Sequence, residues 1–280
     1  LRFIYSNYTS TLGSFIYYKG GDKSAPELYP KTKDTYLIGR NLQFKYTHDE
    51  ELPYIDSDIN PVGRNLDLQY NYEMNEFNNQ GKYSVEDGML KPLYTNFNFH
   101  RIELNWREHF QLFKGHTLTA SVRGGSILGF NFNKKDSTGL KVDSTDFFDF
   151  YLGGLIGMKS YPFYAISGKN VGWLNLTYRF PLLKDIDYRL GVLYLDKIFM
   201  SVYADIGNAW DSNSPKLSDF KKGVGAELRI KMNSFYTFPT SVFFSAAYSF
   251  DKADRIVRDE RVSYGKEWQF YGGILFDFGF

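Results

Sequence analysis

Residues 65–74 alternate completely between apolar and polar side chains, and this pattern limits the fold more than any other feature of the chain. The segment reads NLDLQYNYEM, so an extended backbone would carry Leu, Tyr and Met on one side and Asn, Asp, Gln and Glu on the other. Residues 223–232 and 117–123 repeat the pattern. About ten residues is the length of a tilted strand that crosses a bilayer. The sequence therefore predicts long strands, each with one apolar and one polar face.

Composition agrees with a chain built from strands. Aromatic residues make up 19% of the 280 residues, including 23 Tyr and 26 Phe, and aromatic side chains favour strands. Mean hydropathy is −0.39, and no apolar run approaches the roughly 18 residues of a membrane helix. A net charge of +1 gives no field that would attract nucleic acid. Cysteine is absent, which excludes disulfides and thiolate metal sites.

Alternation and turn residues together predict an all-β fold, a transmembrane antiparallel β-barrel with about eleven strands. Short connections alternate with long polar ones, as they do at the two rims of an outer-membrane barrel, where the long connections lie outside the cell. The connection 48–63 should be short by this rule, and the sequence does not explain its length. The expected strands are 1–9, 12–19, 35–47, 64–77, 99–113, 116–129, 170–181, 196–210, 221–233, 240–251 and 267–280.

A soluble β-sandwich or a lipocalin-like barrel would alternate as well, and alternation does not tell which face is outside. Strand length, aromatic content and the alternating loop lengths favour the membrane. Single-chain bacterial barrels have even strand numbers, and an open sheet edge would lack partners in lipid. About eleven strands therefore indicate that residues 1–280 are an incomplete barrel, with an odd number of strands missing upstream.

Residues 151–168 read YLGGLIGMKSYPFYAISG, five predicted strands follow, one of them contains ADIGNAW, and the chain ends in YGGILFDFGF. From residue 99 onward, this order of segments resembles the BamA/TamA-type outer-membrane superfamily, also called bacterial surface antigen barrels. The resemblance implies that the visible strands are the sixth to sixteenth of sixteen. It makes 130–169 a long extracellular loop that folds into the lumen. Residues 147–168 are similar to a sub-group with a periplasmic β-propeller upstream.

The resemblance also implies a loop site. The tetrapeptide Met158-Lys159-Ser160-Tyr161 stands where the family has Val-Arg-Gly-Phe/Tyr. Lys159 replaces the arginine, and a lysine offers a point charge where arginine offers a planar fork. We expect Lys159 to reach into the lumen and pair with an acidic residue on the following strands.

That acidic partner is expected to be Asp205. It matches the family's acidic residue on the thirteenth strand, and Gly207 and Trp210 fit the same strand pattern. Thr177 stands where a second acidic partner is usual, so one lysine would balance one aspartate. A terminal assembly signal and a weakly paired seam are expected at Gly272, Gly273, Phe276, Phe278 and Phe280.

The remaining polar residues give no catalytic pattern. The four histidines have neither metal-ligand nor triad spacing, so exposed or rim positions are expected for His48, His100, His109 and His116. Two groups of aspartates lack the glycine and ordered ligands of a calcium loop, and no Gly-x-Ser-x-Gly elbow occurs. We expect no enzyme activity, no cofactor and no metal site. The aspartates are Asp143, Asp146 and Asp149 in one loop, and Asp56 and Asp58 in another.

The resemblance implies a protein of the Gram-negative outer membrane that helps to insert or export other proteins. Its partners would be outer-membrane lipid and lipopolysaccharide, client polypeptides and accessory subunits, without nucleic acid. Two alternatives stay open. One is a passive barrel that acts as an anchor or narrow pore for a periplasmic domain. The other is a soluble β-rich binding module, which solubility without detergent would favour.

Overall fold

The computed structural model describes twelve segments of the chain, and within them nearly all regular structure is strand. Two short 3-10 helices occur, η2 (Asp146–Phe148) and η3 (Leu217–Asp219). In the described ranges no helix is both long enough and apolar enough to span a membrane. The all-β prediction is confirmed. The described ranges are 1–12, 15–18, 26–29, 32–52, 59–78, 81–86, 89–129, 146–155, 157–211, 215–235, 237–257 and 260–276.

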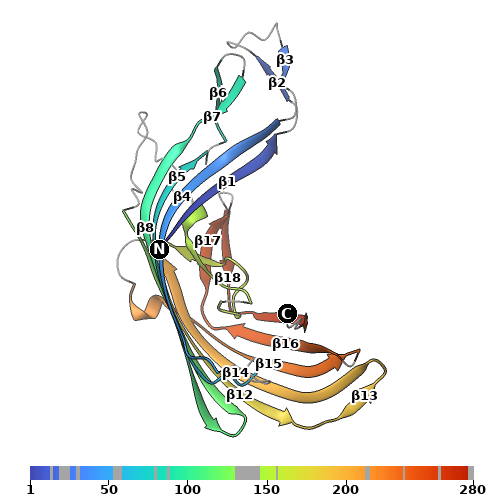
Figure 1. Cartoon of the computed structure of the whole chain (residues 1–280). Helices are drawn as coiled ribbons and strands as arrows, with labels where there is room; N and C mark the ends of the chain where they lie inside the picture. Colours follow the sequence, from blue (N-terminus) through green and yellow to red (C-terminus); the bar gives the residue numbers. More distant parts are fainter. Residues whose placement is uncertain are drawn as a thin grey trace. The chain divides into compact units, whose positions relative to one another are not determined.

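One antiparallel sheet contains the long strands, in the order β1-β4-β5-β8-β9-β12-β14-β15-β16-β19, and β13 (Tyr188–Leu190) also pairs with β14. Long strands therefore pair with their neighbours along the chain (Figure 1). Within the described residues the order does not return from β19 to β1, so the sheet is open. The ten strands are β1 (Arg2–Leu12), β4 (Thr32–Asp49), β5 (Gly63–Phe77), β8 (Thr95–Phe113), β9 (His116–Leu128), β12 (Asn170–Leu183), β14 (Leu193–Trp210), β15 (Lys221–Ser234), β16 (Phe238–Ser249) and β19 (Trp268–Phe276).

Four short two-stranded hairpins lie within the long connections between these strands. Each of these four connections therefore contains a hairpin between the two long strands that it joins. The hairpin strands are β2 (Phe15–Tyr18) and β3 (Pro26–Tyr29), β6 (Tyr83–Glu86) and β7 (Met89–Pro92), β10 (Phe150–Leu152) and β11 (Ile166–Gly168), and β17 (Ala253–Val257) and β18 (Glu260–Tyr264).

The chain divides into two compact units. Unit 1 comprises Leu1–Lys45, Gln69–Ile102 and Ile127–Thr145. Unit 2 comprises Tyr46–Leu68, Glu103–Ser126 and Asp146–Phe280, and it holds every residue of the site discussed below.

In unit 2 the polar face of the sheet is buried and the apolar face is exposed. Asp205 on β14 is 4% exposed, whereas Val202, three residues earlier on the outward side, is 40% exposed. This is the reverse of a soluble sandwich, in which apolar side chains fill the interior. Buried side chains of the polar face include Thr119, Thr177, Asp205, Glu227 and Ser245, and exposed ones of the apolar face include Leu176, Val202, Leu228, Phe244 and Phe270.

In unit 1 the buried side chains are of both kinds, since Phe97 and Phe99 on β8 are buried together with polar residues. On β5, Asn71 and Asn75 are buried, although they belong to the polar side of the alternating segment. On β1 and β4, Phe3 and Phe44 are exposed. The sequence therefore predicted the alternation of side chains correctly, and the structure adds which side of the sheet is buried.

The predicted strand 12–19 is wrong. β1 continues through Leu12 and pairs with β4 along its whole length, from Arg2 opposite Gln43 to Leu12 opposite Thr32. Residues 10–12, which read STL and lie at the junction of the first two predicted strands, were expected to turn, but threonine favours an extended chain. Residues 15–18 instead form β2 of a short hairpin with β3. In the described residues the sheet has ten long strands in sequence, with the short β13 as an eleventh member, and the argument for an odd number of missing strands no longer holds.

The long connection between β4 and β5 also has an explanation. Its two arms continue the hairpin, since Glu50 N donates to Arg64 O at 2.9 Å and Leu52 N to Val62 O at 3.0 Å. Ile59, just before the second arm, is 2% exposed. The connection is long because it packs on the polar face instead of turning at once. Residues 53–58, with Asp56 and Asp58, lie outside the described residues.

Candidate functional site

Residues 146–168 form a compact loop on the polar face of unit 2, built around the hairpin of β10 and β11. Phe150 and Leu152 of β10 are each 1% exposed, so the hairpin is anchored by its apolar side chains. Gly153 and Gly154 follow with φ angles of 114° and 81°. These angles favour glycine, and they turn the chain toward the Met158-Lys159-Ser160-Tyr161 tetrapeptide.

Three residues of the tetrapeptide are completely buried. Met158, Ser160 and Tyr161 are each 0% exposed. Tyr161 N donates to Met158 O at 3.0 Å, and Gly154 N donates to Tyr161 O at 2.8 Å, which closes a tight turn. The Tyr161 hydroxyl donates to Asp251 O at 2.7 Å, and burial raises the pKa of this phenol. The tetrapeptide is thus a fixed part of the packing.

Lys159 pairs with Glu227 on β15. Its Nζ lies 2.7 Å from Glu227 Oε2 and 4.9 Å from the centre of the Tyr203 ring, a cation–π distance. The other carboxylate oxygen, Oε1, lies 2.7 Å from Nη2 of Arg229. Glu227 is therefore the residue that anchors the loop lysine, and sequence reasoning missed it.

Asp205, the expected partner, is not the residue that Lys159 contacts. Its Oδ1 accepts hydrogen bonds from Trp173 Nε1 at 3.0 Å and from Asn175 Nδ2 at 2.9 Å. Oδ2 is buried and has no hydrogen-bond partner in the described part of the chain. Thr177, at the position of the family's second acid, donates to Asn175 Oδ1 at 2.7 Å. Asp205 thus orders a polar row on β12, and the predicted Lys159–Asp205 pair is wrong because Glu227 lies within closer reach.

Glycines on β14 and β15 make room for the tetrapeptide. A Cβ on Gly207 would lie 3.0 Å from Met158 Sδ, and a Cβ on Gly223 would collide with the Ser160 side chain. Gly207 was predicted at this site and is indeed against the loop. Gly223 is a further member, and its signal in the sequence is an unexplained glycine within a strongly alternating strand.

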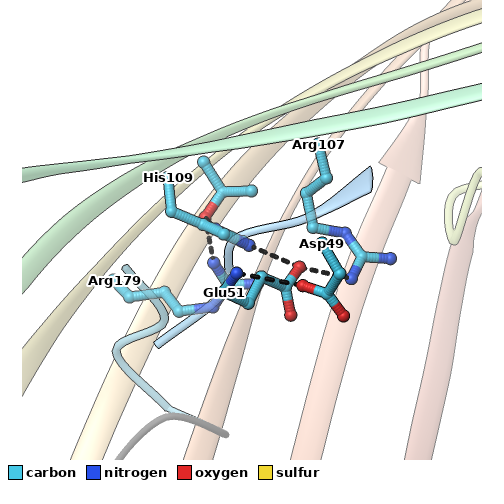
Figure 2. Close-up of polar contacts among 6 residues, drawn as sticks. Asp49, Glu51, Arg107, His109 and Arg179 are labelled. Atoms are coloured by element: carbon cyan, nitrogen blue, oxygen red, sulfur yellow. Dashed lines mark hydrogen bonds and ion pairs between the residues drawn. The ribbon is translucent and has the colours of Figure 1, made fainter. Parts of the chain in front are cut away.

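A polar cavity of about 410 Å³ adjoins the loop, with Lys159, Asp205 and Glu227 in its wall. On the side formed by β8, a chain of contacts runs from Arg107 through Glu51 to His109 (Figure 2). Arg107 Nη1 is 3.4 Å and His109 Nε2 is 3.3 Å from Glu51 Oε1. Glu51 belongs to the connection between β4 and β5. The inward course of this connection places Glu51 in the wall of the cavity.

His109 is buried, 6% exposed, so the expectation of an exposed or rim position is wrong for this histidine. Its Nδ1 lies 2.8 Å from Thr119 Oγ1. His100 stacks on Tyr70, and His48 lies 3.2 Å from Glu50. The sequence did not predict the burial of His109. The residues at the neighbouring positions on the same face of β8 are polar, so they gave no sign that this face is buried.

In the closing strand β19, Phe276 lies on the apolar face. Phe276, Ile274 and Phe270 are all more than half exposed, and Gly272 lies between them. Gly273 faces the other way, where a Cβ would lie 2.8 Å from the Phe243 ring. Phe278 and Phe280 lie outside the described residues.

The aspartates of the long loop do not gather in the described residues. Asp149 forms an ion pair with Lys169, and Asp143 lies outside the described residues. No group of three or more His, Cys, Asp or Glu side chains is placed to hold a metal ion within those ranges.

Comparison with known proteins gives no match to a protein-family model and none to a curated protein.

Proposed function

We propose that this chain is the membrane-embedded part of an outer-membrane β-barrel of a Gram-negative bacterium. The support is the inverted burial: charged and hydroxyl side chains are covered, while alternating Leu, Val and Phe side chains of β12, β14, β15 and β16 are exposed. Water would penalise so large an exposed apolar face, whereas hydrocarbon would accept it. The outward partners would be membrane lipid and lipopolysaccharide.

Within that setting, the proposed role is assembly or translocation of other outer-membrane or exported proteins. The observation that carries this proposal is the buried Met158-Lys159-Ser160-Tyr161 turn, whose lysine is paired on the sheet at 2.7 Å. An inward loop fixed by a cation at this position resembles the BamA/TamA-type barrels. Here Glu227 takes the place of the expected acidic partner of the loop lysine, and it also binds Arg229.

The proposed mechanism is strand templating. β19 pairs with β16 along one edge, and its other edge has no partner within the described residues. Gly272 and Gly273 lower the side-chain packing of that strand. An edge of this kind can add a client strand through main-chain hydrogen bonds. Accessory subunits would assist this addition of a client strand.

A depletion experiment tests the role directly. If the chain assembles other barrels, its depletion should reduce several unrelated outer-membrane barrels before growth stops. Complementation with Glu227→Gln should restore them only in part, and Arg189→Gln, an exposed change on β13, should restore them fully. Unchanged levels of all other barrels after depletion would contradict the assembly role.

A passive barrel is the second candidate. The observation in its favour is that the loop is fully packed, with three buried residues in its turn, which suits a static plug or anchor. In that case depletion would remove only a periplasmic partner from the membrane and leave other barrels in place. The soluble binding module would require the chain to be monodisperse in buffer without detergent.

A further inference from the structure

The cavity on the polar face of unit 2 has more positive than negative side chains in its wall. Four permanently cationic side chains line it, together with three carboxylates. The cations are Arg107, Lys159, Arg179 and Arg229, and the carboxylates are Glu51, Asp205 and Glu227.

Glu227 and Glu51 are occupied by other cationic groups, and Asp205 is hydrogen-bonded at one of its two oxygens. Glu227 gives one oxygen to Lys159 and the other to Arg229, both at 2.7 Å. Glu51 is shared by Arg107 and His109. Asp205 accepts from the side chains of β12 described above. Within the described residues none of the three forms an ion pair with Arg179.

Arg179 therefore has an incomplete set of partners. Its Nη1 donates to Thr119 Oγ1 at 2.6 Å, at the end of the chain of contacts that begins at Arg107 (Figure 2). A guanidinium has five N–H donors in a planar fork, and a hydroxyl uses one of them. Its charged neighbours are Arg229, Glu227 and Arg107, two of which repel it. Glu227 alone among these charged neighbours attracts the cation, so a further anion in the cavity would stabilise it.

We propose that the cavity binds a small oxyanion, a phosphate or carboxylate group held by the guanidinium fork of Arg179, with Arg107 and Arg229 adding positive charge. A fork of parallel N–H groups matches the oxygens of such a group in a bidentate manner. A volume of about 410 Å³ accommodates the anion with several waters, since a water occupies about 30 Å³. This inference goes beyond the assembly role and does not depend on it.

Titration with inorganic phosphate tests the proposal on the full chain in a nonionic detergent and a phosphate-free buffer. Trp173 lines the cavity, so its fluorescence and calorimetry provide two readouts. We expect saturable binding at one site, with chloride as a weak competitor. Arg179→Gln should weaken phosphate binding about tenfold or more, because it removes a charge-assisted contact. Arg189→Gln, the same change at an exposed position of β13, should leave binding unchanged.

A second variant keeps every cation in place. Ser201 lies opposite Arg179 in the register of β12 and β14 and lines the cavity, so Ser201→Glu supplies a built-in carboxylate. It should abolish phosphate binding without lowering the unfolding temperature.

A parallel titration with short-chain phosphatidic acid micelles distinguishes two sources of the anion. If the site takes a lipid phosphate, the micelles should compete with inorganic phosphate for binding. If it takes a soluble oxyanion, the micelles should leave phosphate binding unchanged. No saturable binding by the parent, retention of binding by both cavity variants, or equal weakening by Arg189→Gln would overturn the proposal.

Discussion

Glu227 divides its two carboxylate oxygens between Lys159 and Arg229, and this geometry decides how the loop is held. Glu227 lies opposite Ser201 on β14. Along β14, Ser201 is two residues before Tyr203 and four before Asp205. A lysine side chain placed over Tyr203 can therefore reach either acid, and only side-chain positions decide between them. Spacing along the sequence could predict a buried acid on these strands, but it could not predict which one.

A double-mutant cycle should separate the two acids. Lys159→Met leaves Glu227 with Arg229 as its remaining partner, so the loss of unfolding free energy should lie toward the lower end of the about 3–5 kcal/mol typical of a broken buried pair. The coupling energy between Lys159→Met and Glu227→Gln should exceed 1 kcal/mol or so, and that between Lys159→Met and Asp205→Asn should be smaller. Denaturant unfolding in detergent measures both. Equal couplings would mean that Asp205 shares the lysine after all.

The glycine at position 223 provides a second test at the scale of one atom. Gly223→Ala places a methyl group against Ser160, so we expect a loss of about 1–3 kcal/mol from overpacking and a loop that is more readily cleaved by protease. The matched control is Gly272→Ala, whose Cβ meets nothing closer than 3.6 Å. Adding Ser160→Gly to Gly223→Ala should restore most of the stability. If both alanine variants behave alike, the close contact is not what requires glycine.

At the scale of the elements, the sequence predicted the long strands well because alternation is local. The complete alternation of 65–74 lies inside β5, and five long strands follow the loop as expected. The end of β1 was misplaced because the residues of STL suit a turn only weakly, and the pairing that extends β1 to Leu12 is with β4, some twenty residues further along. The inward course of the connection after β4 depends on packing that no local pattern records.

A charged substitution on the apolar face should show whether that face contacts lipid hydrocarbon or water. Val202→Lys lies in the middle of β14 on the exposed side, and it should cost about 2–4 kcal/mol and lower the yield of folded barrel if that face meets lipid. Leu217→Lys, at the most exposed large apolar side chain after Leu1 and in the connection between β14 and β15, should have little effect. Folded yield in a bilayer and the temperature of heat-modifiability measure the difference. A neutral or solubilising effect of Val202→Lys would favour a soluble protein.

At the scale of the whole molecule, the open order of the sheet is the feature that matters for function. β1 pairs with β4 and β19 with β16, and each has an edge without a main-sheet partner in the described residues. In hydrocarbon an unpaired backbone group costs several kcal/mol, so such edges need partners, whether from further strands or from a client. Strand number could not be fixed from the sequence, because one misplaced turn changes its parity.

Hydrogen exchange of the full chain in micelles should reveal which edges are unpaired. Amides of β14 and β15, which have partners on both sides, should exchange most slowly. In β19 every second amide should exchange faster, because one edge of that strand has no partner in the described residues. Lys159→Met should raise exchange in residues 157–164 and in β15 while leaving β9 unchanged, since the loop is held from β15. Protection of all β19 amides to the level of β15 would mean that this edge is already paired, and strand templating at β19 would then have to be abandoned.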